Sequence, residues 1–140
     1  MIVLDTNVIS ELMRAEPDAG MLSWMERQAM AGLFTTTLTQ AEIFYGLALL
    51  PEGRRRETLV AAAQPMFDVD LAGRVLPFDI DAALAYPVIA AGRRQSGQPI
   101  SQIDAQIAAI VRSRGARLAT RNVRDFENCG IGLVDPWTER

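Results

Sequence analysis

The chain opens with an apolar run that leads directly into an acid, and this junction constrains the fold more than any other stretch. Residues 1–4 precede Asp5, and a helix-like apolar pattern occupies residues 8–13. A short continuous apolar run is typical of a strand buried on both faces, and Thr6 or Asn7 is a suitable helix N-cap. Asp5 is therefore predicted where a buried strand ends and a helix begins. Ligands bind at that edge of open α/β sheets, although the acid could also do no more than cap the helix.

Strand-like and helix-like segments alternate along the rest of the chain, which is typical of a parallel sheet with helices on both faces. We predict a three-layer α/β/α sandwich with a central parallel sheet, formed by one domain over residues 1–140. Pro77 has no backbone N–H to donate to a neighbouring strand, so the strand that contains it is predicted at the edge of the sheet. Pro87 should kink or interrupt its helix. The predicted strands are residues 33–37, 74–78, 117–120 and 131–134, and the predicted helices are residues 19–31, 40–50, 54–66, 80–95 and 102–114, with a polar turn or short helix at residues 121–126.

The composition narrows the chemistry that the chain can perform. It contains no histidine, which excludes Ser-His and Cys-His nucleophiles, imidazole acid–base catalysis and His-ligated zinc. Cys129 is the only cysteine, so no internal disulfide can form, as expected in a reducing compartment. No apolar run approaches the ~18 residues of a membrane span, and we expect a cytoplasmic protein. The net charge of -3 argues against binding by overall positive charge, but a local basic patch or a bound cation would still permit nucleic-acid binding.

Several acids are predicted to meet at one edge of the sheet. Asp5, Glu42 and Asp125 follow predicted strands, with the amide of Asn122 beside the last of them, and Asp104 lies in the first turn of a helix that leads into a strand. The carboxyl ends of parallel strands share one edge, and the helices that return to the strands begin at that same edge. Each acid also has an ordinary interpretation, as an arginine partner, a first-turn acid or a turn residue, but a common position for all of them favours a site.

The helix over residues 40–50, which Thr39 is predicted to cap, supports this interpretation. Glu42 falls on the same helical stripe as Leu38, Tyr45 and Leu49, so it is predicted to point with the apolar residues. A solvated acid normally lies on the opposite face of a helix.

Gathered carboxylates repel one another and are costly to desolvate unless they share protons or bind a cation. Oxygen ligands without histidine or a usable cysteine select Mg²⁺ or Mn²⁺, and such a site is typical of enzymes that cut phosphodiesters with a metal-activated water. A covalent-aspartate phosphatase fits less well because it needs a second Asp where Asn7 stands, and the chain has neither a P-loop nor a Gly-x-Gly-x-x-Gly motif.

Four segments resemble the signature blocks of PIN-domain ribonucleases, in particular the FitB-like branch of the VapC toxins. They are residues 4–11, 39–46, 103–109 and 118–126, and the resemblance spans essentially the whole chain. It implies a compact α/β/α sandwich and a Mg²⁺- or Mn²⁺-dependent endonuclease that cleaves RNA as the toxin of a toxin–antitoxin pair.

The resemblance also assigns residues. Asp5, Glu42 and Asp104 match the family's first three acids, whereas Asn122 stands where many members have an aspartate. That departure affects the charge of a second metal site, and Asp125 could supply the missing carboxylate or a water-mediated contact.

Three further residues are expected to support the site, and partners follow from the same resemblance. Thr120 matches the family's hydroxyl before the fourth position, and Thr6 and Asn7 follow the first acid. Such toxins form homodimers and bind an antitoxin whose C-terminal segment covers the active-site groove, while its N-terminal part binds operator DNA.

Two other groups of residues are candidates for binding. Arg121 and Arg124 are the best placed to contact RNA phosphates, and the run of arginines at residues 54–56 is interpreted as a solvated helix start. The further phosphate candidates are Arg93, Arg94 and Arg112, and the candidates for an apolar partner groove, or else for ordinary core, are Leu22, Trp24, Met25, Phe44, Tyr45, Leu47 and Leu50.

Two rival functions remain open from the sequence. A non-catalytic module that binds an antitoxin and tunes its affinity for operator DNA is favoured by Asn122 alone. A DNA-directed nuclease would use the same metal site.

Overall fold

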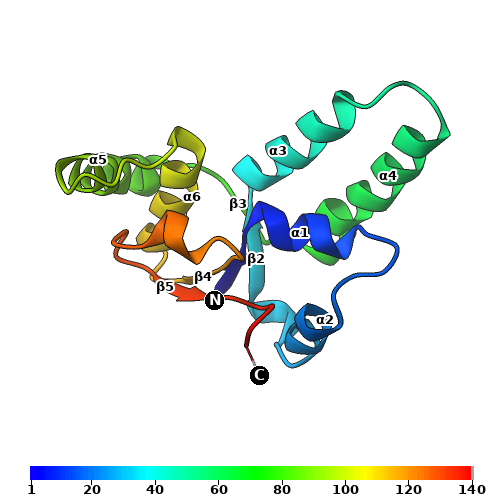
Figure 1. The fold of residues 1–140 in the computed structure, drawn as a ribbon, viewed down its shortest axis with the longest axis horizontal. Helices are drawn as coiled ribbons and strands as arrows, with labels where there is room; N and C mark the ends of the chain where they lie inside the picture. The colour runs from blue at the N-terminus through cyan, green and yellow to red at the C-terminus, as the bar shows by residue number, and fades with distance from the viewer. Residues whose placement is uncertain (140) are drawn as a thin grey trace.

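The computed structural model describes residues 1–139 and contains a five-stranded sheet between two layers of helices (Figure 1). Every neighbouring pair of strands is parallel. The predicted three-layer sandwich is therefore confirmed, and the strand that precedes Pro77 lies at the sheet edge as expected. The strands are β1 (Ile2–Leu4), β2 (Leu33–Thr36), β3 (Val75–Leu76), β4 (Arg117–Ala119) and β5 (Gly132–Val134), in the spatial order β3-β2-β1-β4-β5.

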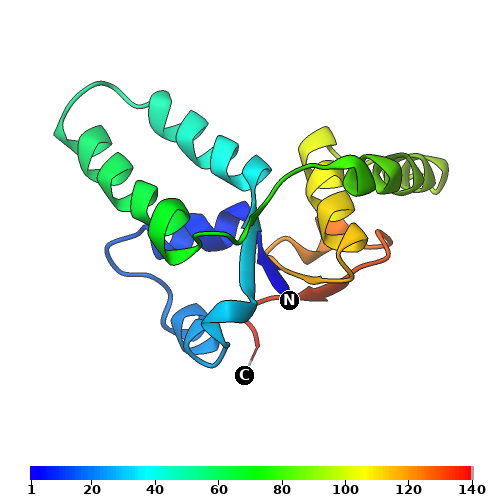
Figure 2. The same ribbon diagram turned by 180° about the vertical axis from the view of Figure 1, so that it is seen from behind.

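The helices divide between the two faces of the sheet. Figure 2 shows α5 and α6 together on one side and α1, α3 and α4 on the other. The helices are α1 (Thr6–Leu12), α2 (Ala19–Glu26), α3 (Thr37–Ala48), α4 (Arg54–Pro65), α5 (Ile80–Gln95) and α6 (Gln102–Ser113), with short helical turns η1 (Met30–Gly32), η2 (Met66–Asp70) and η3 (Val123–Phe126).

Alternating side chains of the central strands fill two separate cores. Val3 of β1 and Leu118 of β4 are fully buried against α5 and α6. Leu4 and Ala119, one position further along each strand, are buried against α1–α4. Burial of a side chain such as leucine contributes roughly 1.5–3 kcal/mol, so both faces of β1 and β4 are held firmly in place. No helix among the described residues is both long and apolar enough to cross a membrane.

Two helix boundaries differ from the sequence prediction. α2 ends at Glu26 and not near Gly32, because the carbonyl of Trp24 accepts from the Arg27 amide and from the Gln28 side chain, which closes the last turn. α3 begins at Thr37, since the Thr36 hydroxyl caps it by accepting from the amide of residue 39 at 3.1 Å. The prediction that Thr39 caps this helix was therefore wrong.

The predicted interruption at Pro87 does not occur, because α5 continues through it. A proline inside a helix removes the donor for the carbonyl four residues earlier. Here that carbonyl belongs to Ala83, and both residues are exposed, so water can satisfy it.

Candidate active site

Asp5 lies at the junction of β1 and α1, as the sequence predicted. It is itself the N-cap of α1, in place of Thr6 or Asn7, with its Oδ1 accepting from the Thr6 amide at 2.8 Å. The Asp5 amide donates to the carbonyl of Ala119 on the neighbouring strand. The carboxylate is only 5% exposed, so both β1 and β4 fix an acid that has little contact with solvent.

Thr120 follows β4 and connects Asp5 to the loop that comes after this strand. Its buried hydroxyl donates to Oδ2 of Asp5 at 2.8 Å. The Thr120 hydroxyl oxygen itself accepts from the Asn122 amide at 3.0 Å and from the Asn7 side chain at 3.3 Å. The side-chain oxygen of Asn7 in turn accepts from the Arg121 amide. The three predicted supporting residues and Asn122 thus contribute to one network around the buried carboxylate.

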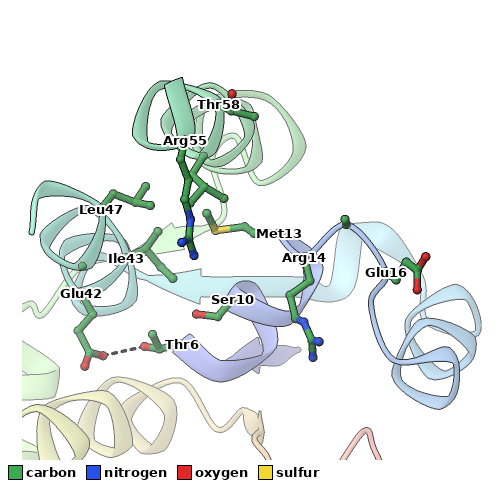
Figure 3. A pocket seen from close by; sticks show the side chains of 13 residues that line it. Thr6, Ser10, Met13, Arg14, Glu16, Glu42, Ile43, Leu47, Arg55 and Thr58 are labelled. Carbon is green, nitrogen blue, oxygen red and sulfur yellow. Dashed lines mark hydrogen bonds between the residues drawn. The ribbon is translucent and has the colours of Figure 1, made fainter. Parts of the chain in front are cut away.

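Glu42 reaches the same place from α3. Its Oε1 accepts from the Thr6 hydroxyl at 2.7 Å, and that hydroxyl lies 3.1 Å from the Thr39 hydroxyl. The predicted stripe on α3 is wrong in part, because the buried face consists of residues 39, 43 and 47, while Tyr45 and Leu49 are 68% and 67% exposed. Glu42 lies half-buried beside this core face and points toward Thr6 (Figure 3).

Asp104 approaches from the other helical layer. It lies in the first turn of α6, where its amide donates to the hydroxyl of the N-cap Ser101 at 3.2 Å. The side chain is half-buried, and the positive end of the helix dipole favours its charge.

Asp5, Glu42 and Asp104 line one open cleft of about 520 Å³ together with Asn122. Asp125 does not line this cleft; it is exposed on η3. The structure therefore gathers four of the five predicted site residues and leaves the fifth outside.

Sequence reasoning missed four other residues of the cleft, Ser10, Glu11, Arg14 and Trp137. Glu11 is 7% exposed, and its carboxylate accepts from the Asp18 amide at 2.9 Å and lies 3.3 Å from Arg14. It stands four residues after Asn7 on the same face of a helix, a spacing that could have indicated it. No local pattern indicates Trp137, whose ring lies 5.1 Å from the Arg121 guanidinium.

Burial governs the electrostatics of the cleft. It raises the pKa of Asp5 from 3.8 to about 6, while the hydrogen bonds from Thr120 and Thr6 act in the opposite direction and the charges of Asp104 and Glu42 add to the rise. Burial also raises the pKa of Asp104, and the nearby carboxylates of Asp125 and Glu42 contribute. The repulsion expected from gathered acids is thus present, and a cation would relieve it.

The donor set fits a hydrated hard cation better than a closed cage. Among residues 1–139, no group of three or more acidic or cysteine side chains is arranged to hold a metal ion by itself. Mg²⁺, however, commonly keeps several waters and binds proteins through one or two carboxylates. Asp5 and Asp104, with Glu42 across the cleft, supply oxygen ligands of this kind, so the residues present fit such an ion.

The arginine candidates have separate outcomes. The prediction that Arg93 contacts RNA phosphates is wrong. This residue is 6% exposed, and its guanidinium donates to the carbonyls of Gln98, Asp125 and Glu127 at 2.6–2.9 Å. Its charge also favours the ionised form of Asp104 and so lowers the pKa of that acid. The other four candidates are exposed: Arg94, Arg112, Arg121 and Arg124.

The apolar candidates belong mostly to the core. Trp24 and Leu47 are buried, and four others pack against the core formed with α1–α4. Only Tyr45 is largely exposed. The interpretation of these residues as ordinary core therefore fits the structure better than the interpretation as a partner groove.

Comparisons with known proteins identify the family. A sequence model described as PIN domain matches residues 2–130. This chain belongs to the PIN-domain family. Within the family it is a VapC-type protein: it is 43% identical over 137 residues to "VapC ribonuclease Y4jK" of Sinorhizobium fredii, with 98% of each chain covered. It is also 33% identical to "Toxin FitB" of Neisseria gonorrhoeae, with 98% of this chain and 99% of the relative covered.

Solved structures agree with this assignment. The crystal structure of FitAcB from Neisseria gonorrhoeae contains a chain that matches this PIN domain with a TM-score of 0.92 at 32% identity, covering 99% of this chain and 100% of that one. DNA-bound VapBC from Salmonella typhimurium matches with a TM-score of 0.81 at 26% identity, covering 96% and 97%.

Proposed function

We propose that this PIN domain is a Mg²⁺- or Mn²⁺-dependent endoribonuclease that serves as the toxin of a toxin–antitoxin pair. The observation that carries the proposal is the cleft in which Asp5, Glu42 and Asp104 meet from β1, α3 and α6. The relatives named as a VapC ribonuclease and as a tRNA(fMet)-specific endonuclease support it.

Each residue has a distinct part in the proposed reaction. When bound, the cation lowers the pKa of a water and neutralises charge on the phosphate oxygens. Asp5 and Asp104 would anchor the cation, Glu42 would orient or co-ligate it, and Asn122 would complete the outer part of the site, while Asp125 would act only through its charge from outside the cleft. The Thr120 hydroxyl and the Thr6 amide hold the Asp5 carboxylate in one orientation.

The substrate must approach a negatively charged cleft, so cations are needed beside it. Arg121 lines the cleft with its guanidinium over the Trp137 ring, and Arg124 follows on η3. Both are proposed to contact RNA phosphates, which Arg side chains bind well.

The partners proposed are an antitoxin and a second copy of this chain. Structural relatives include toxin–antitoxin complexes, and one of these is DNA-bound VapBC; operator DNA would accordingly be reached only through the antitoxin.

For the second copy, α5 exposes Ile80, Leu84 and Val88 at 80%, 69% and 58%. This spacing places them on one stripe, which a homodimer would cover. The chain would act in the cytoplasm, on cellular RNA, as a single domain.

The proposal is tested with Asp5→Asn and Asp104→Asn, assayed on RNA with Mg²⁺ or Mn²⁺ and again with EDTA. Both variants should lose cleavage and growth inhibition while remaining folded by circular dichroism. Full activity in either variant, or wild-type cleavage that persists in EDTA, would refute the assignment.

The same assays separate the rival functions. A non-catalytic module would show neither Mg²⁺ binding by calorimetry nor cleavage, and a DNA-directed nuclease would cut single-stranded DNA in preference to RNA.

A further inference from the structure

A second cavity, of about 870 Å³, adjoins the acidic cleft between α1, α3 and α4 (Figure 3). We call it the α3–α4 pocket. It shares Thr6, Ser10, Arg14 and Glu42 with the cleft. An RNA strand that passes through the cleft can therefore continue into this pocket over the Glu42 side chain.

Arg55 enters the α3–α4 pocket from the first turn of α4 (Figure 3). It is exposed and forms no ion pair within residues 1–139. Its neighbours in sequence, Arg54 and Arg56, do not line this pocket. Of the three arginines that begin this helix, only the exposed Arg55 therefore lines the pocket that adjoins the acidic cleft.

The rest of the lining combines apolar walls, hydroxyl groups and the charged side chains of Arg14, Glu16 and Glu42. Met13, Ile43 and Leu47 supply apolar surface, and Ser10 supplies a hydroxyl on the side of the cleft. Gly46 leaves the α3 wall open, since no atom lies within 4 Å of the position its Cβ would take. A flat apolar group with polar edges, next to an anion, fits such a lining.

We propose that the α3–α4 pocket binds a nucleotide of single-stranded RNA next to the scissile phosphate, with Arg55 contacting a backbone phosphate. This inference rests on the proposed ribonuclease function. A polyanion that crosses the acidic cleft needs positive charge on both sides. Arg121 provides it on one side, and Arg55 provides it on the other. Unstacked bases of single strands can enter protein pockets, whereas those of a duplex cannot.

The first test compares Arg55→Gln with Arg54→Gln, which remove the same charge from the same turn. Binding of a fluorescent single-stranded oligoribonucleotide is followed by anisotropy in EDTA over a series of salt concentrations. Arg55→Gln should weaken binding several-fold and reduce the slope of log K against log salt by about 0.7, the value for one lost phosphate contact on a single strand. Arg54→Gln should leave the slope unchanged; equal effects of the two variants would overturn the inference.

The second test fills the pocket. Gly46→Leu adds a side chain on a helix where it favours folding, and Gly92→Leu is the matched control, because Gly92 is also helical with nothing within 4 Å of its Cβ position. Gly46→Leu should raise KM for single-stranded RNA on the order of tenfold with little change in kcat, and the control should not.

The outcomes also distinguish this inference from the proposed function. A wild-type protein that neither binds nor cleaves RNA refutes the proposed function. A wild-type protein that cleaves RNA, with Gly46→Leu matching its control, refutes the pocket alone. Loss of antitoxin binding in Gly46→Leu with unchanged RNA kinetics would assign the pocket to a protein segment and overturn the inference.

Discussion

The hydroxyl of Thr120 donates a 2.8 Å hydrogen bond to Oδ2 of Asp5, across 115 positions of sequence. The Thr6 amide binds the other carboxylate oxygen. With one donor on each oxygen, the buried carboxylate cannot rotate without losing a hydrogen bond. The orientation of Asp5 in the cleft is therefore fixed by β4 as well as by its own helix.

Replacing Thr120 with valine should destabilise the protein by roughly 1–3 kcal/mol, because it removes a donor to Asp5 and the acceptor for the Asn122 amide. The pKa of Asp5 should rise further, since the hydrogen bond from Thr120 lowers it. Urea unfolding measures the first effect. Thr120→Ser keeps the hydroxyl and should retain most of the stability; a valine variant as stable as wild type would contradict this role.

The stability of the protein should depend on the ionisation of Asp5. Burial raises its pKa from 3.8 to about 6 in the folded state. The stabilising contribution of Asp5 to the free energy of unfolding is therefore complete below the pKa that this group has in the unfolded state. It is lost as the pH rises through the pKa of the folded state. In EDTA, between about pH 4 and pH 7, this loss should amount to on the order of 3 kcal/mol.

The loss is measured as the difference between wild type and Asp5→Asn, which lacks the titrating group, in urea unfolding at several pH values. Added Mg²⁺ should stabilise the wild type more at pH 7 than at pH 5, because a cation favours the ionised carboxylate. A constant difference between the two proteins across this range would show that Asp5 is not titrating there.

Asn122 and Asp125 should contribute unequally, because only Asn122 lines the cleft. Asn122→Asp adds a carboxylate there and should tighten Mg²⁺ binding, as measured by calorimetry. Asp125→Asn removes an exposed charge and should change metal affinity only slightly. A larger loss in Asp125→Asn than the gain in Asn122→Asp would make Asp125 the residue that completes the site.

Arg93 should be needed for stability, because its buried guanidinium donates to the backbone carbonyls of Gln98, Asp125 and Glu127 and so ties the end of α5 to the η3 segment. Arg93→Met leaves these acceptors without a partner and should cost about 3 kcal/mol or more in urea unfolding. Arg94→Met, an exposed neighbour on the same helix, is the control and should be nearly neutral. Similar stability of the two variants would argue against the role assigned to Arg93.

The exposed stripe on α5 should determine the oligomeric state. Leu84→Glu places a charge in the middle of the stripe and should convert a dimer into a monomer, as measured by light scattering. Ala61→Glu, on the exposed side of α4, should have no such effect. A wild-type monomer at high concentration, or a Leu84→Glu dimer, would exclude this surface as the contact.

The sequence by itself determined the layered fold, the edge strand before Pro77 and the common edge of Asp5, Glu42 and Asp104. These follow from local patterns: apolar runs set the buried strands, N-cap residues set helix starts, and parallel strands end at one edge of a sheet. The resemblance of four short blocks added the family, because those blocks carry the residues of the cleft.

Only the tertiary structure decided which side chains meet. Local pattern made Arg93 a candidate for phosphate binding and placed Arg55 in a solvated helix start. In the structure Arg93 is buried and donates to three backbone carbonyls, whereas Arg55 points into a pocket. Local pattern could not decide whether Asn122 or Asp125 lines the cleft, and it did not indicate that Trp137 does. Such distinctions depend on contacts between segments distant in sequence, and these form only when the helices pack on the two faces of the sheet.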